Sequence, residues 1–178
     1  MSDILVHVFA VQVLGLGGHL AIAATDLDGQ NPQYVHWGPM VQDHSPQSGM
    51  GYKRVPLGLP FSVTDRLGPW KADDGSYVAL SNEYIGTLWS GIVGTDSWQK
   101  VLDWSNALDA SNVAYDPLGW GGYSSNSAVR YVFEDILDQD FDQLAFDQVK
   151  PFRRGPIQVR RWFPGVLSKM PKIEPICY

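Results

Sequence analysis

The first forty residues alternate between apolar runs and short polar turns. Residues 4–14 read ILVHVFAVQVL, a nearly continuous apolar run that is typical of a buried strand. Two further strands are predicted at residues 19–25 and 33–37, and an Asp-Gly hairpin connection separates them. Gly38-Pro39 is predicted to end the third strand. The pattern therefore indicates a three-stranded antiparallel meander.

The middle of the chain has a weaker pattern. Residues 41–60 have the composition of a loop, and the two prolines between residues 54 and 61 allow at most an edge strand there. Short strands are predicted at residues 61–67, leading into a Gly68-Pro69 turn, and at residues 77–80.

Two helices are predicted in the second half. Asp96 or Ser97 is suited to begin a helix that runs to about residue 110. A second helix is predicted from Ser124 or Ser125 to about residue 137, because its apolar residues recur at spacings of three and four. The pattern as a whole predicts an α+β fold in which helices pack on an antiparallel sheet.

The length and composition fit one domain with a core of its own. The chain has 178 residues, of which 44% are hydrophobic, so a stable core needs neither a disulfide nor a metal. We expect the folded domain to span residues 1–149. Residues 150–178 are rich in proline and are predicted to form an irregular, extended tail that packs on the domain or on a partner.

Charge and cysteine content exclude several classes of function. The net charge of −6 argues against nucleic acid as a partner, because phosphate binding needs a basic surface. The single cysteine, Cys177, permits no internal disulfide and no cysteine metal site. The Asp-Gly hairpin lacks the glutamate of a calcium loop, and His36 and His44 lack a third ligand. No metal and no cofactor is therefore predicted.

The apolar N-terminal segment lacks the features of a signal peptide or a membrane helix. No Lys or Arg precedes it, Asp3 stands where positive charge is expected, and His7, Gln12 and several glycines interrupt it. We therefore predict no integral membrane segment. The location is predicted to be cytoplasmic, or outside the cell after export without a cleaved signal peptide.

Two segments carry candidate chemistry. Gly17-Gly18-His19 places a histidine at the start of a predicted strand, directly after a glycine turn. Ser124-Ser125-Asn126-Ser127 opens the second predicted helix, where free N–H groups and the positive end of the helix dipole stabilise an anion. A serine at such a position is suited to act as a nucleophile, and a histidine on a neighbouring strand is suited to take its proton.

Both segments also have a simpler interpretation. Ser124, Ser125 and Asn126 are all favourable N-cap residues, so the cluster is equally typical of an ordinary helix start. His19 is equally typical of a hydrogen-bonded histidine in a core or a turn. The spacing alone leaves both interpretations open.

The order of the motifs resembles the circularly permuted papain-like proteins, including the desumoylating-type peptidases and the lecithin–retinol acyltransferase group. The matching elements are His19-Leu20-Ala21-Ile22, the Asp-Gly hairpin, a strand that ends in Gly38-Pro39, and the late Ser124-Ser125-Asn126-Ser127. The chain is most similar to uncharacterised bacterial members whose late motif reads Asn-Ser-Asn-Ser. The resemblance spans residues 17–137.

The resemblance implies a role for each candidate residue. Ser125 corresponds to the nucleophile and His19 to its base. Gln33, Tyr34 or His36, on the next strand, would orient His19, and His36 is preferred because an imidazole nitrogen can accept a hydrogen bond from His19. A role for His36 on the surface is an equally open interpretation. The candidate binding residues are Gln33, Trp120, Gly122, Ser124 and Asn126.

Two positions depart from the pattern of that family. Ser125 stands where the pattern has cysteine, and Ser124 stands where it has asparagine. A hydroxyl has a much higher pKa than a thiol, so Ser125 needs a strong base and a good oxyanion site. The branch has therefore either adapted to serine chemistry or kept the fold and lost the reaction.

Two classes of function follow. The first is a hydrolase or acyltransferase that acts on an amide, ester or thioester in a protein, peptidoglycan or lipid, as in a bacterial effector. The second is a catalytically inactive binding module, or a structural component of a phage or secretion assembly, with a protein partner held through the C-terminal tail.

Overall fold

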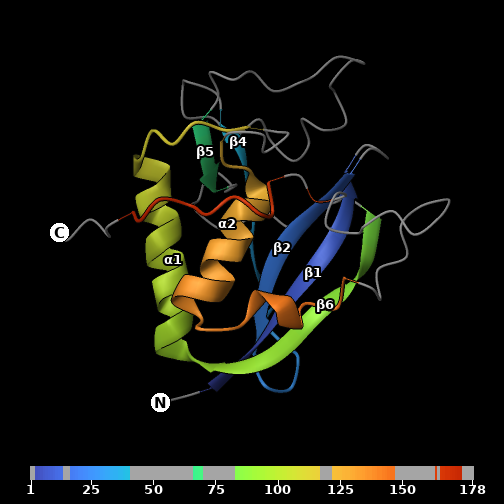
Figure 1. Ribbon diagram of the computed structural model, residues 1–178. Coiled ribbons are helices and arrows are strands. Elements are labelled where there is room, and N and C mark those ends of the chain that lie inside the picture. The colour runs from blue at the N-terminus through green and yellow to red at the C-terminus, as the bar shows by residue number, and fades with distance from the viewer. Residues whose placement is uncertain are drawn as a thin grey trace, which may run out of the picture.

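A four-stranded antiparallel sheet lies at the centre of the fold (Figure 1). The computed structural model describes residues 3–13, 17–40, 66–69, 83–116, 122–146, 163 and 165–173. The strand order is β3-β2-β1-β6, and each neighbouring pair is antiparallel. The strands are β1 (Asp3–Val13), β2 (Gly17–Thr25), β3 (Gln33–Val35) and β6 (Glu83–Gly94). The predicted meander of the first three strands is confirmed.

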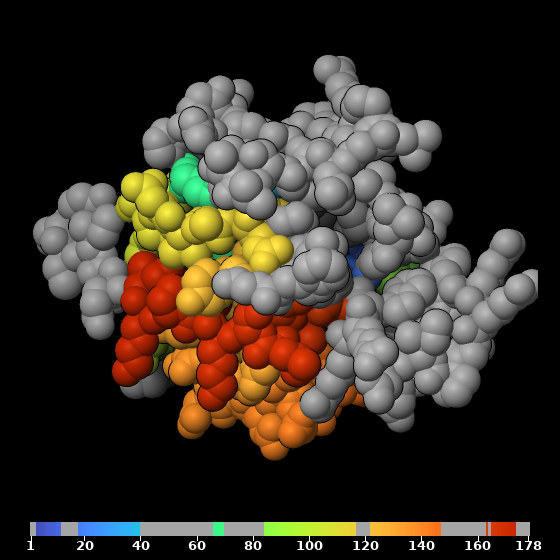
Figure 2. Space-filling view, turned by 45° about the horizontal axis from the view of Figure 1, so that its top comes forward, coloured from blue at the N-terminus to red at the C-terminus, as the bar shows by residue number. Residues whose placement is uncertain are grey.

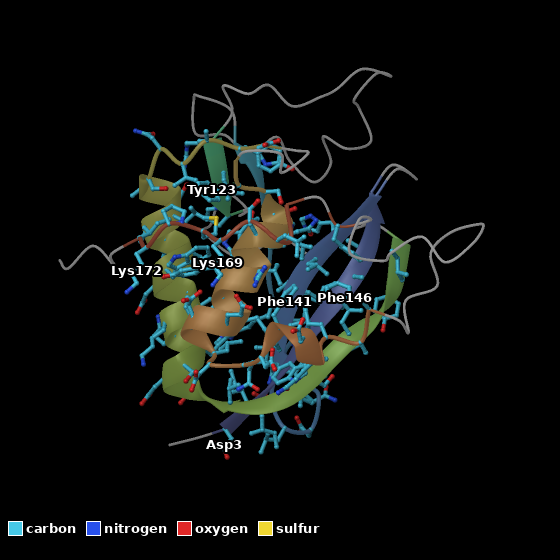
Figure 3. All side chains as sticks on the ribbon, in the orientation of Figure 1. Asp3, Tyr123, Phe141, Phe146, Lys169 and Lys172 are labelled. Atoms are coloured by element: carbon cyan, nitrogen blue, oxygen red, sulfur yellow. The ribbon has the colours of Figure 1, made fainter. Side chains whose placement is uncertain are left out.

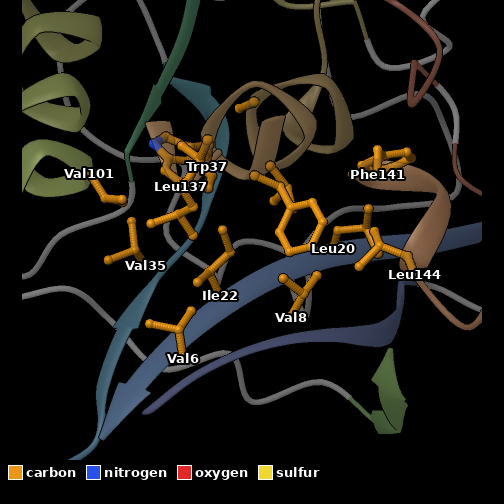
Figure 4. Close-up of a cluster of buried hydrophobic side chains, with 14 of the residues drawn as sticks. Val6, Val8, Leu20, Ile22, Val35, Trp37, Val101, Leu137, Phe141 and Leu144 are labelled. Carbon is orange, nitrogen blue, oxygen red and sulfur yellow. The ribbon is translucent and has the colours of Figure 1, made fainter. Parts of the chain in front are cut away.

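Alternation along β1 and β2 creates the core face of the sheet. Val8 is paired with Ile22, and Ala10 with Leu20, and all four side chains are fully buried. Successive residues of a strand point to opposite faces, so the residues two positions along join them on the same side. Figure 4 shows Val6, Val8, Leu20 and Ile22 on this face, with Val35 and Trp37 beside them.

The strand β6 was not predicted from the sequence. It pairs with β1 over most of its length, with register shifts between Val8 and Phe9 and between Ala10 and Val11. Each shift sets two residues of β6 against one of β1, which breaks the period of two along β6. Gly86 and Gly91 weaken the strand pattern further.

The helices cover the core face of the sheet (Figure 1). They are α1 (Thr95–Ala110), α2 (Ser125–Tyr131) and two shorter elements, the π-helical turn η2 (Val132–Ile136) and the 3-10 turn η3 (Phe141–Gln143). The predicted start of α1 at Asp96 or Ser97 is wrong, because Gly94 is its N-cap and Asp96 lies in its first turn. The predicted start of the second helix is confirmed, with Ser124 as N-cap.

A second, two-stranded sheet contradicts two predicted breaks. Its strands are β4 (Trp37–Met40) and β5 (Arg66–Pro69), paired antiparallel. Gly38-Pro39 and Gly68-Pro69 therefore lie inside strands, where they were predicted to end a strand and to form a turn. Proline lacks an N–H, but a strand tolerates it at a position whose N–H would not bond to the partner strand.

Part of the C-terminal segment packs on the core. Phe163, Val166 and Met170 are buried, and the Arg130 side chain of α2 donates a hydrogen bond to the Val166 carbonyl at 3.3 Å. Figure 2 shows residues 165–173 in red beside the orange of α2 and η2. Lys169 and Lys172, labelled in Figure 3, lie along this segment and are exposed. The division of the chain at residue 150 stays a prediction.

Several predicted elements lie outside the described residues. They are the strand at residues 77–80, most of the strand at 61–67, and the remainder of the tail. Within the described ranges, no helix combines the length and the apolar character needed to cross a membrane.

Candidate functional site

The structure brings His19 and Ser125 into direct contact. His19 lies near the start of β2 and Ser125 is the first residue of α2, and the two are 106 positions apart in the chain. The His19 Nδ1 and Ser125 Oγ atoms are 2.9 Å apart, which is hydrogen-bond distance. His19 is 3% exposed and Ser125 is 5% exposed, so the contact is largely shielded from water.

The neighbours of Ser125 carry out the capping of α2. Ser124 has an extended backbone and serves as N-cap, and its backbone N–H donates to Ser127 Oγ at 2.6 Å. Ser127 Oγ donates in turn to the Ser124 carbonyl at 2.9 Å. Ser124 and Ser127 form the capping box, so the hydroxyl of Ser125 does not cap the helix. It contacts His19 instead. The helix-cap interpretation therefore applies to Ser124.

Asn126 links the helix to the strand that carries His19. Its Oδ1 accepts a hydrogen bond from the Leu20 N–H at 2.8 Å, and its Nδ2 donates to the Gly18 carbonyl at 3.2 Å. These two backbone groups belong to the residues on either side of His19. Asn126 is only 2% exposed.

His36 lies beside His19. It occupies the position between β3 and β4, is 1% exposed, and its ring meets that of His19 edge to face with 6.0 Å between the centroids. The structure thus brings together the predicted nucleophile, its base and the preferred third residue. The contact between the two imidazoles is therefore one of ring packing.

Burial determines the charge state of His19. Removal from water and, as a smaller cause, the electrostatic influence of the neighbouring His36 together lower the pKa of His19 to about 3. His19 is therefore neutral at pH 7. A neutral imidazole can accept the Ser125 proton at Nδ1 when its own proton is on Nε2, whereas the other tautomer donates from Nδ1 to Oγ.

Two of the predicted binding residues lie elsewhere or are already engaged. Gln33 pairs with Ala24 on β2 and accepts a hydrogen bond from Trp98 Nε1 at 2.8 Å. Gln33 therefore lies opposite a residue of β2 that is five positions beyond His19, a distance of about 16 Å along the strand. The Gly122 N–H donates to Asp116 Oδ2 at 3.0 Å, so it is occupied. Trp120 lies outside the described residues.

Phe163 is a neighbour of the site that the sequence did not indicate. A Cβ placed on Gly18 would lie 2.3 Å from a carbon of the Phe163 ring, so the ring rests directly on the Gly18 backbone. This close approach explains why a residue without a side chain stands next to His19. The paired glycines before His19 were the available signal, but they do not identify what approaches them.

In the described part of the chain, no three His, Cys, Asp or Glu side chains are grouped so that they could hold a metal ion. Comparisons with protein-family models, curated proteins and solved structures gave no match. The geometry around His19 and Ser125 is therefore the basis on which a function can be proposed.

Proposed function

We propose that this protein is a serine hydrolase or acyltransferase that acts on an amide, ester or thioester. The observation that carries the proposal is the 2.9 Å contact between His19 Nδ1 and Ser125 Oγ. It joins a nucleophile at a helix start to a neutral base on a neighbouring strand, which is the arrangement that activates a serine. The substrate classes are protein, peptidoglycan and lipid.

The proposed reaction proceeds through an acyl-enzyme. Ser125 Oγ attacks the carbonyl carbon of the substrate while its proton passes to His19 Nδ1. The tetrahedral intermediate collapses as His19 returns the proton to the leaving amine, alcohol or thiol. Water then releases the acyl group in a hydrolase, and another nucleophile releases it in an acyltransferase, with His19 again accepting and returning a proton. Backbone N–H groups in the first turn of α2 are suited to the developing oxyanion.

The chain order supports a permuted papain-like fold for this site. His19 precedes Ser125 in the sequence, His19 stands on a strand, and Ser125 opens a helix. The permuted papain-like resemblance implies the same order and the same elements. The fold itself is α+β with an antiparallel sheet, which is compatible with that proposal.

A covalent probe tests the proposal. Intact-mass spectrometry after incubation with a fluorophosphonate is expected to show one adduct on the wild type and none on Ser125→Ala. Ser90→Ala is the matched control, because Ser90 also contacts a histidine Nδ1, at 2.7 Å, but on an exposed surface. An adduct that persists in Ser125→Ala, or a wild type that stays unmodified while folded, would contradict the proposal.

One observation favours a second candidate function, a catalytically inactive module that binds a partner. His19, His36 and Ser125 are each at most 5% exposed, and an imidazolium is costly in such a dry site. In that case the three side chains are a buried polar network that stabilises the fold. The two candidates differ in whether Ser125 reacts, which the same labelling experiment measures.

A further inference from the structure

The edge of β2 near His19 extends past the end of β3. The pairing between these strands covers Ile22 to Ala24 of β2, and residues 18–20 come before that stretch. On its other side β2 pairs with β1 throughout, down to Gly17. Backbone groups of Gly18 and Leu20 that point away from β1 therefore need hydrogen-bond partners from some element other than β3.

The side chain of Asn126 takes the place of a neighbouring strand. It accepts from the Leu20 N–H and donates to the Gly18 carbonyl, which is the pair of bonds that a strand residue makes with its partner. A carboxamide carries one acceptor and one donor group on a short side chain, as a peptide group does. An ionised aspartate lacks the donor, and alanine lacks both functions.

The hydrogen bonds of Asn126 lie directly beside the contact between His19 and Ser125. Ser125 and Asn126 are consecutive in α2, and His19 lies between the two residues that Asn126 holds. The 2.9 Å contact between His19 and Ser125 is a third link between α2 and β2. Asn126 therefore links the start of α2 to β2 at one residue from Ser125.

We propose that Asn126 is a positioning residue that sets the His19–Ser125 distance, and that it does not bind substrate. It is 2% exposed, and both its carboxamide atoms already have backbone partners, so it has no surface to offer a ligand. The proposal differs from the sequence-based expectation, in which Asn126 is a binding residue. Its effect on catalysis rests on the proposed function, whereas its effect on His19 does not.

Nitrogen NMR of the histidine rings tests the positioning role without any assumption about activity. The chain has four histidines, so His→Gln variants assign the His19 signals. In Asn126→Ala we expect the His19 ring nitrogens to shift and the ring to protonate at a higher pH than in the wild type. Unchanged His19 signals in a folded Asn126→Ala protein would overturn the proposal.

Ser105→Ala is the matched control for lost buried hydrogen bonds. Ser105 is fully buried, accepts from Trp37 Nε1 at 3.2 Å and donates to the Val101 carbonyl at 2.9 Å, so its removal also costs two bonds. The His19 signals of the Ser105→Ala variant are expected to match those of the wild type. If Asn126→Ala does not fold, Asn126→Asp serves instead, because an ionised aspartate keeps the acceptor for Leu20 and loses the donor to Gly18.

The rate of fluorophosphonate labelling measures the catalytic consequence. A misplacement of about 1 Å costs up to about 100-fold in rate, so we expect Asn126→Ala to label roughly 10- to 100-fold more slowly than wild type and Ser105→Ala. Equal labelling rates would overturn the positioning role. A wild type that does not label would refute the proposed function alone, and the NMR comparison would still decide the role of Asn126.

Discussion

Two serine–histidine pairs in this protein have the same contact atoms in different surroundings. His7 Nδ1 and Ser90 Oγ are 2.7 Å apart on an exposed part of the sheet, where the residues are direct cross-strand neighbours on β1 and β6. His19 Nδ1 and Ser125 Oγ are 2.9 Å apart and buried. The shorter contact belongs to the pair with no further site features, so distance alone does not identify a catalytic pair.

The surroundings distinguish the buried pair. Ser125 opens a helix, Asn126 fixes the strand of His19, and His36 packs against the His19 ring. The His7–Ser90 pair stands on two adjacent strands, and each partner is reached by water. A base that activates a serine must be held in place, and contacts of this kind surround the buried histidine.

The largest expected difference between the two pairs is in reactivity. His19→Gln is expected to slow fluorophosphonate labelling by about 100- to 10,000-fold, the usual contribution of a general base. His7→Gln is expected to leave the rate within about twofold of the wild type, because Ser125 keeps its own base. Labelling time courses followed by intact mass measure both. Equal rates for the two variants would show that the buried pair is no more activated than the exposed one.

The pH dependence of stability gives the next largest effect. The unfolded chain protonates His19 near pH 6.5, but the folded protein does so only near pH 3. Between these values the unfolded state binds the extra proton, so the free energy of unfolding falls as the pH falls. The loss from pH 7 to pH 5 is about 2 kcal/mol from this residue. Urea unfolding at both pH values measures it.

His19→Gln and His7→Gln again serve as the comparison. The pH-dependent loss is expected to shrink in His19→Gln and to persist in His7→Gln. If His19→Gln shows the same decrease in the free energy of unfolding between pH 7 and pH 5, the buried imidazole of His19 does not cause that decrease.

Close packing beside His19 predicts a smaller effect. Gly18→Ala would place a Cβ 2.3 Å from the Phe163 ring, so we expect a loss of about 1–3 kcal/mol in the free energy of unfolding, as for an overpacked core. Gly86→Ala is the control, because nothing lies within 4 Å of the added Cβ there. Thermal unfolding of both variants measures the difference. Equal stabilities would mean that Phe163 does not rest on Gly18.

The smallest expected effect is on the exposed pair. Ser90→Ala is expected to change the free energy of unfolding by less than about 0.5 kcal/mol, because water replaces the lost hydroxyl. Ser125→Ala deprives a buried nitrogen of its hydroxyl partner, which costs about 1–3 kcal/mol. Chemical denaturation compares the two. If Ser90→Ala lowers the free energy of unfolding more than Ser125→Ala does, the expected difference between the exposed and the buried pair is contradicted.

Local pattern was enough to predict much of the fold. The strands β1 and β2 are apolar with few interruptions, and the two main helices repeat at three and four residues, so each has a periodic signal. The strand β6 has no such signal, because its register shifts and glycines interrupt the alternation. The strand β4 was not predicted, because it contains Gly38-Pro39 and this pair of residues usually ends a strand.

The site was predictable in its residue types but not in its contacts. Glycines before His19 and a polar cluster at a helix start drew attention to both segments, and the order of motifs connected them. The role of Asn126 depends on where β3 ends, and the approach of Phe163 depends on a segment 145 positions away from Gly18 (163 − 18). No local pattern encodes such tertiary contacts.

The 106-residue separation of His19 and Ser125 also affects the order of events during synthesis. The strands β1 and β2 are made before α2 and can pair by a local hairpin, whereas α2 follows β2 only after about 100 further residues. Contact between the two residues requires a long loop to close, which costs more chain entropy than closing the hairpin between β1 and β2. A nascent or truncated chain that stops before α2 therefore carries the histidine without its serine, and the pair comes into existence only with the nearly complete domain.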